Sequence, residues 1–202
     1  MSTHEDGIHS LREVKMRGHS PWPDTVDSKA FLGSTTLVGS AAVLQRIQVW
    51  NDMDDNRALV EIDEHEHSAC AVPILRGSLL AGVLIASSTQ PDFFKDPTAC
   101  QAVTEYALLM GVALCDREFH PSALLHLRPM PPLHWQREEI NRTYLNRIIA
   151  YAHKHSTSRR DAEFWIQHEM ELEFEDEAHR ILEQQKFVHE ISNPSNRSRF
   201  FG

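Results

Sequence analysis

The alternation of apolar and polar residues is clearest between residues 68 and 87. Two apolar runs, residues 68–74 and 79–87, are separated by the tight-turn sequence Arg76-Gly77-Ser78, and this pattern predicts an antiparallel β-hairpin. The second run is apolar at consecutive positions, as expected for a strand that is covered on both faces of a sheet. Pro73 has no backbone N–H, so we expect it where no ladder hydrogen bond is required.

Apolar residues at helical spacing predict two helices around this hairpin. A short helix is expected over residues 39–49, with Ser40 as its cap, and a longer one over residues 98–116. Asp96 is placed to cap the longer helix, and Pro97 is tolerated in its first turn because it has no N–H to leave unpaired. The face that this helix is expected to bury consists of Val103, Tyr106, Ala107, Met110, Val112, Ala113 and Leu114.

Two further helices are predicted in the C-terminal third. Residues 135–155 carry apolar positions at helical spacing, and the sequence Ser158-Arg159-Arg160-Asp161 is a capping box that opens a second helix. The apolar stripe of that second helix is formed by Ala162, Trp165, Ile166, Met170, Phe174, Ala178, Ile181 and Leu182. This stripe could form a dimerisation face or pack on the chain's own sheet.

The remaining segments suggest how the chain is divided. Residues 7–17 begin after the turn-forming pair Asp6-Gly7 and are interpreted as a strand, and residues 18–27 as a loop. Residues 120–133 contain four prolines, which favour a rigid, extended linker. The predicted units are a domain over 1–120, a linker over 121–134, a helical extension over 135–190 and a flexible tail over 191–202.

Composition and charge narrow the class of protein. The chain has 202 residues, 41% of them hydrophobic, which is enough to form a core, and its formal net charge is −9. This charge argues against non-specific binding to nucleic acid. No apolar run is long enough to cross a membrane and the N-terminus does not resemble a signal peptide, so we expect a cytoplasmic protein without a membrane partner. Three cysteines without CxxC spacing predict reduced thiols.

The central part of the chain resembles the GAF family of small-molecule and light-sensing domains. The resemblance covers roughly residues 8–118 and rests on four motifs, Leu37-Val38-Gly39-Ser40-Ala41, Ala71-Val72-Pro73-Ile74, residues 80–88 and Phe93-Phe94 before the long helix. It implies an α+β fold with a central antiparallel sheet flanked by helices. It also implies that the first helix and strand of the domain are missing here, as in a truncated domain or a fragment. Neither the Cys-His pair of chromophore-binding members nor the Asn-Lys-x-x-Asp motif of cyclic-nucleotide-binding members is present, so the cofactor is unknown.

The resemblance places a ligand between the sheet and residues 39–67. The candidate ligand-binding residues are Trp50, Asp52, Arg57, Cys70, Val72, Ile74, Val83 and Ile85. Trp50 lies where GAF domains wall their cavity, but it could equally be a core residue beside a solvated turn. Cys70 could attach a tetrapyrrole, bind haem or sense redox state, whereas a buried structural thiol is the simpler interpretation.

An acidic segment over residues 61–67 holds the candidate metal ligands. His65 and His67 are two residues apart, which on a strand would place both imidazoles on one face about 7 Å apart, with carboxylates nearby to complete a site. The alternative is a solvated acidic loop at the rim of the ligand site.

The sequence thus favours a sensor or regulatory domain that binds a small molecule or chromophore and signals through the helices of residues 135–190, by homo-oligomerisation or to a partner protein. The alternative is a degenerate GAF-like subunit that acts in structure or protein interaction without a ligand. Because the sequence has no nucleophile elbow, phosphate-binding loop, zinc-protease motif or dinucleotide fingerprint, we expect that the chain is not an enzyme.

Overall fold

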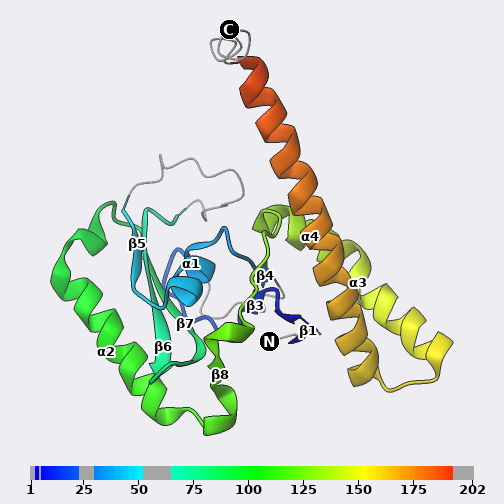
Figure 1. Ribbon diagram of the computed structural model, residues 1–202, viewed down its shortest axis with the longest axis horizontal. Coiled ribbons are helices and arrows are strands. Elements are labelled where there is room, and N and C mark those ends of the chain that lie inside the picture. The colour runs from blue at the N-terminus through cyan, green and yellow to red at the C-terminus, as the bar shows by residue number, and fades with distance from the viewer. Residues whose placement is uncertain (1–2, 5, 23–29, 52–64, 193–202) are drawn as a thin grey trace, which may run out of the picture.

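The computed structural model describes residues 3–4, 6–22, 30–51 and 65–192 of the chain. Its largest sheet is antiparallel and has the strand order β5-β6-β7-β8, formed by Gln48–Trp50, Ser68–Arg76, Leu79–Ser88 and His120–Pro121. Together with four helices, this sheet confirms the predicted α+β class (Figure 1).

The predicted hairpin is confirmed as β6 and β7. Gly77 lies in the turn with φ +61°, a conformation that costs glycine little because it has no Cβ. Strand β5 pairs only with residues 69–71 of β6, so Pro73 lies where β6 has one described neighbouring strand, β7. The missing N–H of Pro73 is therefore tolerated in a central strand, as the sequence predicted.

Helices α1 and α2 lie on opposite faces of the sheet (Figure 1). Helix α1, Leu37–Leu44, begins earlier than predicted, because the cap is Thr36, whose Oγ1 accepts from Gly39 N at 2.9 Å. Ser40 therefore lies inside the helix and is not its cap. The helix ends where Gln45 adopts the left-handed conformation, and the chain then forms β5 in place of the expected last helical turn.

Helix α2, Pro97–Ala113, begins as predicted, with the Asp96 side chain accepting from Thr98 N at 2.9 Å. It follows a 3-10 turn, η1, over Phe93–Lys95. At its other end, Arg76 Nε donates to Gly111 O at 3.2 Å and Arg76 Nη2 donates to Leu114 O at 2.8 Å. A cation thus satisfies carbonyls at the negative end of the helix dipole.

The face that α2 buries differs from the predicted one. Val103, Ala107 and Gly111 are buried against the sheet, whereas Tyr106 and Val112 are 65% and 82% exposed. The physical reason is close approach, because a Cβ on Gly111 would lie 3.0 Å from the carbonyl oxygen of Leu75. The helix therefore presents its small residues to β6, and its larger apolar side chains face outward.

The two predicted C-terminal helices are α3, Leu133–His155, and α4, Arg159–Ser192, which pack against each other as a helical hairpin. Ser158 caps α4, since its Oγ accepts from Asp161 N at 3.1 Å. The buried apolar residues of α4 recur every fourth position from Ala162 to Ala178. Trp165 lies on the flank, 50% exposed, although the sequence had placed it in the stripe. Figure 1 shows α4 extending well beyond the sheet domain and α3.

The predicted strand over residues 7–17 is replaced by two short strands, β2 (Gly7–Ile8) and β3 (Leu11–Arg12). Strand β2 pairs with β1, Thr3–His4, around the predicted turn, and β3 pairs with β4, Phe31–Leu32. These strands lie between the sheet domain and the helical hairpin (Figure 1). The loop expected over residues 18–27 falls partly outside the described residues. Two 3-10 turns, η2 (Asp116–Glu118) and η3 (Ser122–Leu124), complete the connection from α2 towards α3.

Candidate functional site

The candidate ligand-binding residues are divided between the two faces of the sheet. Cys70, Val72 and Ile74 alternate along β6 and are buried beneath α2, with Val103 and Ala107. By contrast, Trp50 and Val83 pack with α1. Because side chains alternate along a strand, a single pocket cannot be lined by both groups.

The face beneath α1 is an apolar surface with polar groups at one edge. Ala69 and Ala71 form its floor, and Trp50 pairs with Ala69 across the sheet. Ile85 pairs with Ala71 and is 44% exposed. At the same end of β7, Ser87 Oγ donates to Glu66 Oε1 at 2.6 Å. Ala69 and Ala71 are fully buried and pack against Leu37 and Ala41 of α1, so the part of this face that is exposed is its edge at Ile85 and Ser87.

Two other candidate ligand residues, Asp52 and Arg57, fall outside the described residues, so their role stays a prediction. The same is true of most of the acidic segment. His65 is partly buried and His67 exposed, and among the described residues no three His, Cys, Asp or Glu side chains are grouped as a metal ion would require. Metal binding by His65 and His67 also stays a prediction.

The three cysteines differ sharply in environment. Cys70 is fully buried, Cys100 on α2 is partly buried and Cys115 is exposed. Burial, together with the neighbouring Cys100, raises the pKa of the Cys70 thiol to about 12, and Cys100 Sγ donates to the carbonyl of Phe94 at 3.1 Å. At neutral pH the Cys70 thiol is therefore protonated and packed like a small apolar side chain.

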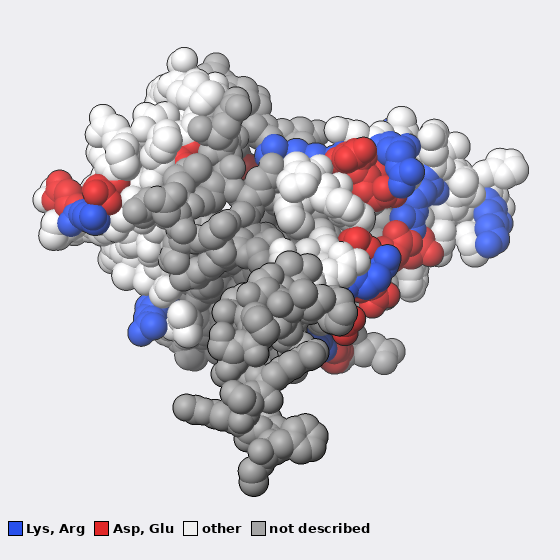
Figure 2. Space-filling view, turned by 90° about the horizontal axis from the view of Figure 1, so that it is seen from above, with Lys and Arg blue, Asp and Glu red and all other residues white. Residues whose placement is uncertain are grey.

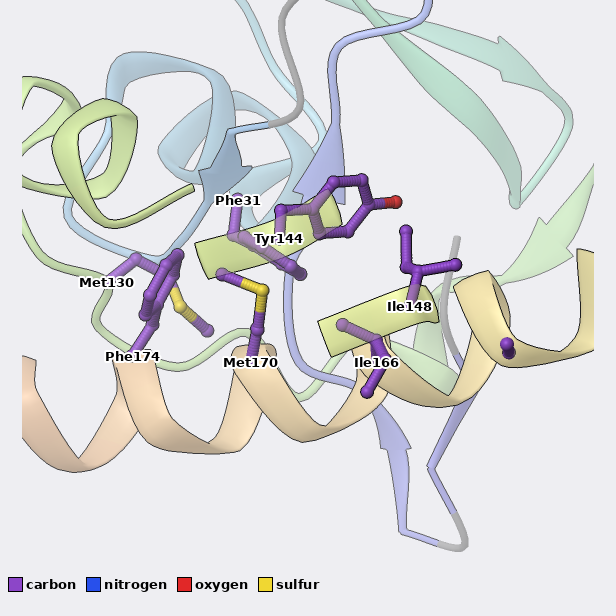
Figure 3. Packing of buried hydrophobic residues seen from close by; sticks show 8 residues of the cluster. Phe31, Met130, Tyr144, Ile148, Ile166, Met170 and Phe174 are labelled. Atoms are coloured by element: carbon purple, nitrogen blue, oxygen red, sulfur yellow. The ribbon is translucent and has the colours of Figure 1, made fainter. Parts of the chain in front are cut away.

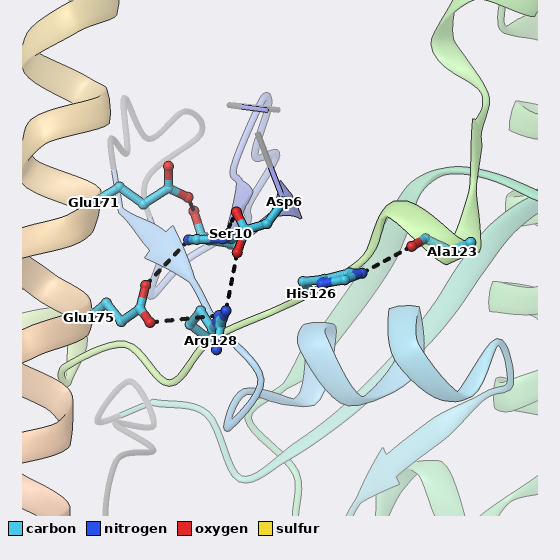
Figure 4. A network of polar contacts seen from close by, with 8 residues as sticks. Asp6, Ser10, Ala123, His126, Arg128, Glu171 and Glu175 are labelled. Atoms are coloured by element: carbon cyan, nitrogen blue, oxygen red, sulfur yellow. Dashed lines mark hydrogen bonds and ion pairs between the residues drawn. The ribbon is translucent and has the colours of Figure 1, made fainter. Parts of the chain in front are cut away.

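A polar junction joins the N-terminal strands to α4 (Figure 4). Ser10 Oγ donates to the buried carboxylate of Glu171. The two ring nitrogens of His9 face Asp6 at 2.8 Å and Glu175 at 3.3 Å. The hydrogen bond from His9 lowers the pKa of Asp6. These contacts hold a segment near the N-terminus against the middle of α4.

Arg128 joins the same junction from the chain that leads to α3. Its guanidinium contacts Asp6 at 3.3 Å and Glu175 at 3.6 Å, as Figure 4 shows. Its backbone N–H donates to His9 O at 2.8 Å. The predicted linker is thus bonded to the N-terminal segment, which the sequence did not indicate.

An apolar junction lies beside the polar one (Figure 3). Phe31 is 2% exposed and belongs to the core of the helical hairpin, where its ring meets that of Phe174 edge to face with centroids 5.3 Å apart. Leu32, the next residue, packs instead with Leu11 and Val38 of the sheet domain. Adjacent side chains on a strand point in opposite directions, so strand β4 contributes to both cores.

Tyr144 of α3 closes the hairpin core. Its hydroxyl donates to Glu163 Oε1 at 2.7 Å and accepts from Gln167 Nε2 at 2.7 Å. Burial is the main reason why the pKa of Tyr144 is raised to about 12. Strand β4 was not predicted from the sequence, because a two-residue strand has no periodicity to detect.

None of the helices in the described part of the chain combines the length and the apolar character needed to cross a bilayer.

Comparison with known proteins adds little information about these sites. No protein-family model matches the chain, and no curated protein matches it. Among solved structures, it is similar to a type II free methionine-R-sulfoxide reductase from Thermoplasma acidophilum. The TM-score is 0.39 and the identity 18%, over 52% of this chain and 74% of that chain. A likeness at this level carries no argument about ligand or mechanism.

These comparisons bear on two predictions made from the sequence, the GAF family and the absence of enzymatic activity. Membership of the GAF family is not confirmed, and what stands is the α+β fold with its antiparallel sheet. The prediction that the chain is not an enzyme was wrong, because the similar structure belongs to an enzyme. The absence of familiar catalytic motifs therefore gives no ground for excluding a reaction on a fold of this kind.

Proposed function

We propose that this chain is a regulatory module in which the sheet domain binds a small ligand and the α3–α4 hairpin transmits the change. The observation that carries the proposal is strand β4, whose adjacent residues Phe31 and Leu32 belong to the cores of the hairpin and of the sheet domain. A ligand that displaces α1 would move Val38 and, through their contact, Leu32. Because Phe31 is adjacent to Leu32 in β4, Phe31 would move with it. Protein cores respond to such shifts because they are close-packed.

The polar junction supports the same route. His9, Ser10 and Arg128 all contact residues of α4, so the N-terminal strands are attached to the hairpin by charge as well as by packing. Partly buried ion pairs are favourable in one geometry and costly when one partner moves away. Two alternative arrangements of the hairpin would therefore differ measurably in free energy.

The ligand site in this proposal is the face beneath α1, where Trp50, Val83 and Ile85 meet the small residues of β6. We infer an uncharged or weakly polar organic ligand, because the described side chains of this face are largely apolar. Cys70, Val72 and Ile74 lie on the opposite face and would act through the core beneath α2.

The experiment starts with native mass spectrometry and an absorption spectrum of the chain purified from its own host. We expect a small molecule that dissociates on denaturation, is lost in Trp50→Ala and is retained in Trp165→Ala. Trp165 is the matched control because it is half-exposed on α4, remote from the sheet. A Trp50→Ala variant that folds normally and keeps the molecule would contradict the site.

Transmission is tested separately by hydrogen exchange. Loss of the ligand should change the exchange of α3 and α4 amides in the unmodified chain. In Phe31→Ala the ligand should still bind, but the response of the helices should disappear. If both chains responded alike, β4 would not be the route.

A second candidate function is a protein-interaction subunit that needs no ligand. Leu145 and Ile149, four residues apart on α3, are 54% and 58% exposed and favour a partner on the hairpin. A chain purified without any small molecule, but always together with another protein, would favour this reading. Release of that protein by Leu145→Glu would place the contact on α3.

A further inference from the structure

The outer face of α2 is lined by large apolar side chains that are exposed to solvent. Tyr106, Leu108, Leu109 and Val112 are 65%, 62%, 65% and 82% exposed, and Met110 is 38% exposed. Glu105 is the single charged residue of the helix. Figure 2 shows charged groups of both signs crowded over the helical hairpin, and fewer, scattered charged groups among the described residues of the sheet domain.

Both faces of α2 are therefore apolar. The inner face meets the sheet through Val103, Ala107 and Gly111, and no part of the chain that the structure describes covers the outer face. A helix that is apolar all round is normally buried on all sides in its working state. Exposed patches of this kind mark interaction sites on proteins.

The composition of the helix narrows the choice of partner. Helix α2 has no Lys or Arg, so it lacks the positive charge with which amphipathic helices bind anionic membranes. The net charge of −9 also disfavours a nucleic acid. An apolar protein surface is the remaining class of partner, and a second copy of this chain supplies one of matching chemistry.

The exposed area suits a pair of identical surfaces. With a large apolar residue taken as roughly 150–220 Å² when fully exposed, the five exposed fractions correspond to about 550 Å² per copy and about 1,100 Å² per pair. Specific interfaces begin near about 1,200 Å², and exposed Ala102 and Ala113 extend the stripe at both ends.

We propose that the chain forms a homodimer in which α2 packs antiparallel against α2 of a second copy, about a two-fold axis near Leu109. In this register Tyr106 meets Val112 of the second copy, and Leu109 meets its own equivalent. Glu105 would face Ala113, so no two carboxylates are opposed. A two-fold interface requires this kind of self-complementarity. The proposal does not depend on the ligand site proposed above.

The single carboxylate of this stripe is Glu105, one helical turn before Leu109. Gln101 Nε2 donates to Glu105 Oε1 at 2.9 Å, so a side chain of the same helix already bonds the carboxylate that would face Ala113 of the second copy. The remaining repulsion comes from the net charge of each copy. Because salt screens such long-range repulsion, the dimer should become tighter as ionic strength rises.

The test uses the full chain and measures its mass in solution by light scattering and sedimentation over a range of concentrations. The unmodified chain should be a dimer. Leu109→Glu and Leu109→Lys should each dissociate about 100-fold more readily or more, because two like charges would meet at the axis without water. Mixing the two variants should restore a dimer, since Glu then meets Lys. The matched control is Leu172→Glu, at an exposed leucine of α4, which should remain dimeric.

Two results would contradict the proposed dimer. A chain that is monomeric at all concentrations overturns the proposal. So does a dimer that survives Leu109→Glu but is broken by Leu172→Glu, which would place the interface on the helical hairpin. The mixed sample guards against a folding defect, because only a folded variant with a symmetric contact at Leu109 can be rescued by its oppositely charged counterpart.

Discussion

The side-chain amide of Gln136 acts as a neighbouring strand for β4. Its Oε1 accepts from Phe31 N at 2.8 Å, and its Nε2 donates to Phe31 O at 3.0 Å and to Pro131 O at 2.7 Å. Gln136 is only 1% exposed. One side chain on α3 thus satisfies three backbone groups between the two bodies of the molecule, and buried backbone groups rarely lack such partners.

We predict that Gln136→Met lowers the free energy of unfolding by about 3–5 kcal/mol. Methionine is similar in length and in helix propensity, so the change removes hydrogen bonds with little change in packing volume. Each buried polar group left without a partner costs about 1–3 kcal/mol. Three such groups would cost about 3–9 kcal/mol, and partial relaxation brings the expected loss to the lower part of that range. In a chain of this size the melting temperature should fall by about 6–20 °C.

The assay is urea unfolding followed by circular dichroism and tryptophan fluorescence. Gln184→Met is the matched control, because it makes the same substitution at an exposed position of α4, where the expected change is within about 0.5 kcal/mol. A difference between the two variants below about 1 kcal/mol would refute the reasoning. It would mean that the amide of Gln136 has no special role in holding β4.

Three further predictions concern single side chains. Arg76→Met should destabilise the chain by about 1–2 kcal/mol, because carbonyls at the end of α2 lose a cationic donor; unchanged urea midpoints would contradict this. Since the folded chain holds the Tyr144 proton up to a pKa of about 12, against about 10 when unfolded, stability should fall as the pH rises from 10 to 12. In Tyr144→Phe this part of the fall should be absent when stability is measured across that window. With iodoacetamide at neutral pH, mass spectrometry should find Cys115 alkylated first and Cys70 only after unfolding, because Cys70 is buried and its pKa is about 12; equal rates would show that Cys70 is accessible.

The β-hairpin of β6 and β7 and the long helices were predictable because local patterns specify them. The run from residue 68 to residue 87 carries its own turn, and α2 carries its own cap and first-turn proline, so neither needs a distant partner to be identified. The face that α2 buries was not predictable in this way. Its orientation depends on Gly111 approaching the carbonyl of Leu75, and such a contact between distant elements leaves no periodic signal.

The candidate site shows the same limit. The two faces of β6 could be separated by counting alternate residues, which places Cys70 and Trp50 on opposite sides once the pairing of β5 is known. That pairing is not visible in the sequence, because a segment of more than ten residues lies between the two strands. The junction at β4 was missed for a related reason, since Phe31 and Gln136 are far apart in the chain and neither stands in a recognisable motif.

Strand β4 also fixes how the chain can vary in length. Because Phe31 and Leu32 face different cores, inserting or deleting one residue just before them would exchange their directions and place each side chain in the wrong body. Residues 13–19, which form no helix or strand, have no comparable restriction. Cutting the chain between α2 and α3 would also leave the hairpin without Phe31, and the sheet domain without the helix that holds its N-terminal strands. The sheet domain and the α3–α4 hairpin should therefore tolerate separation, permutation and domain insertion far less well than the proline-rich segment between them suggests.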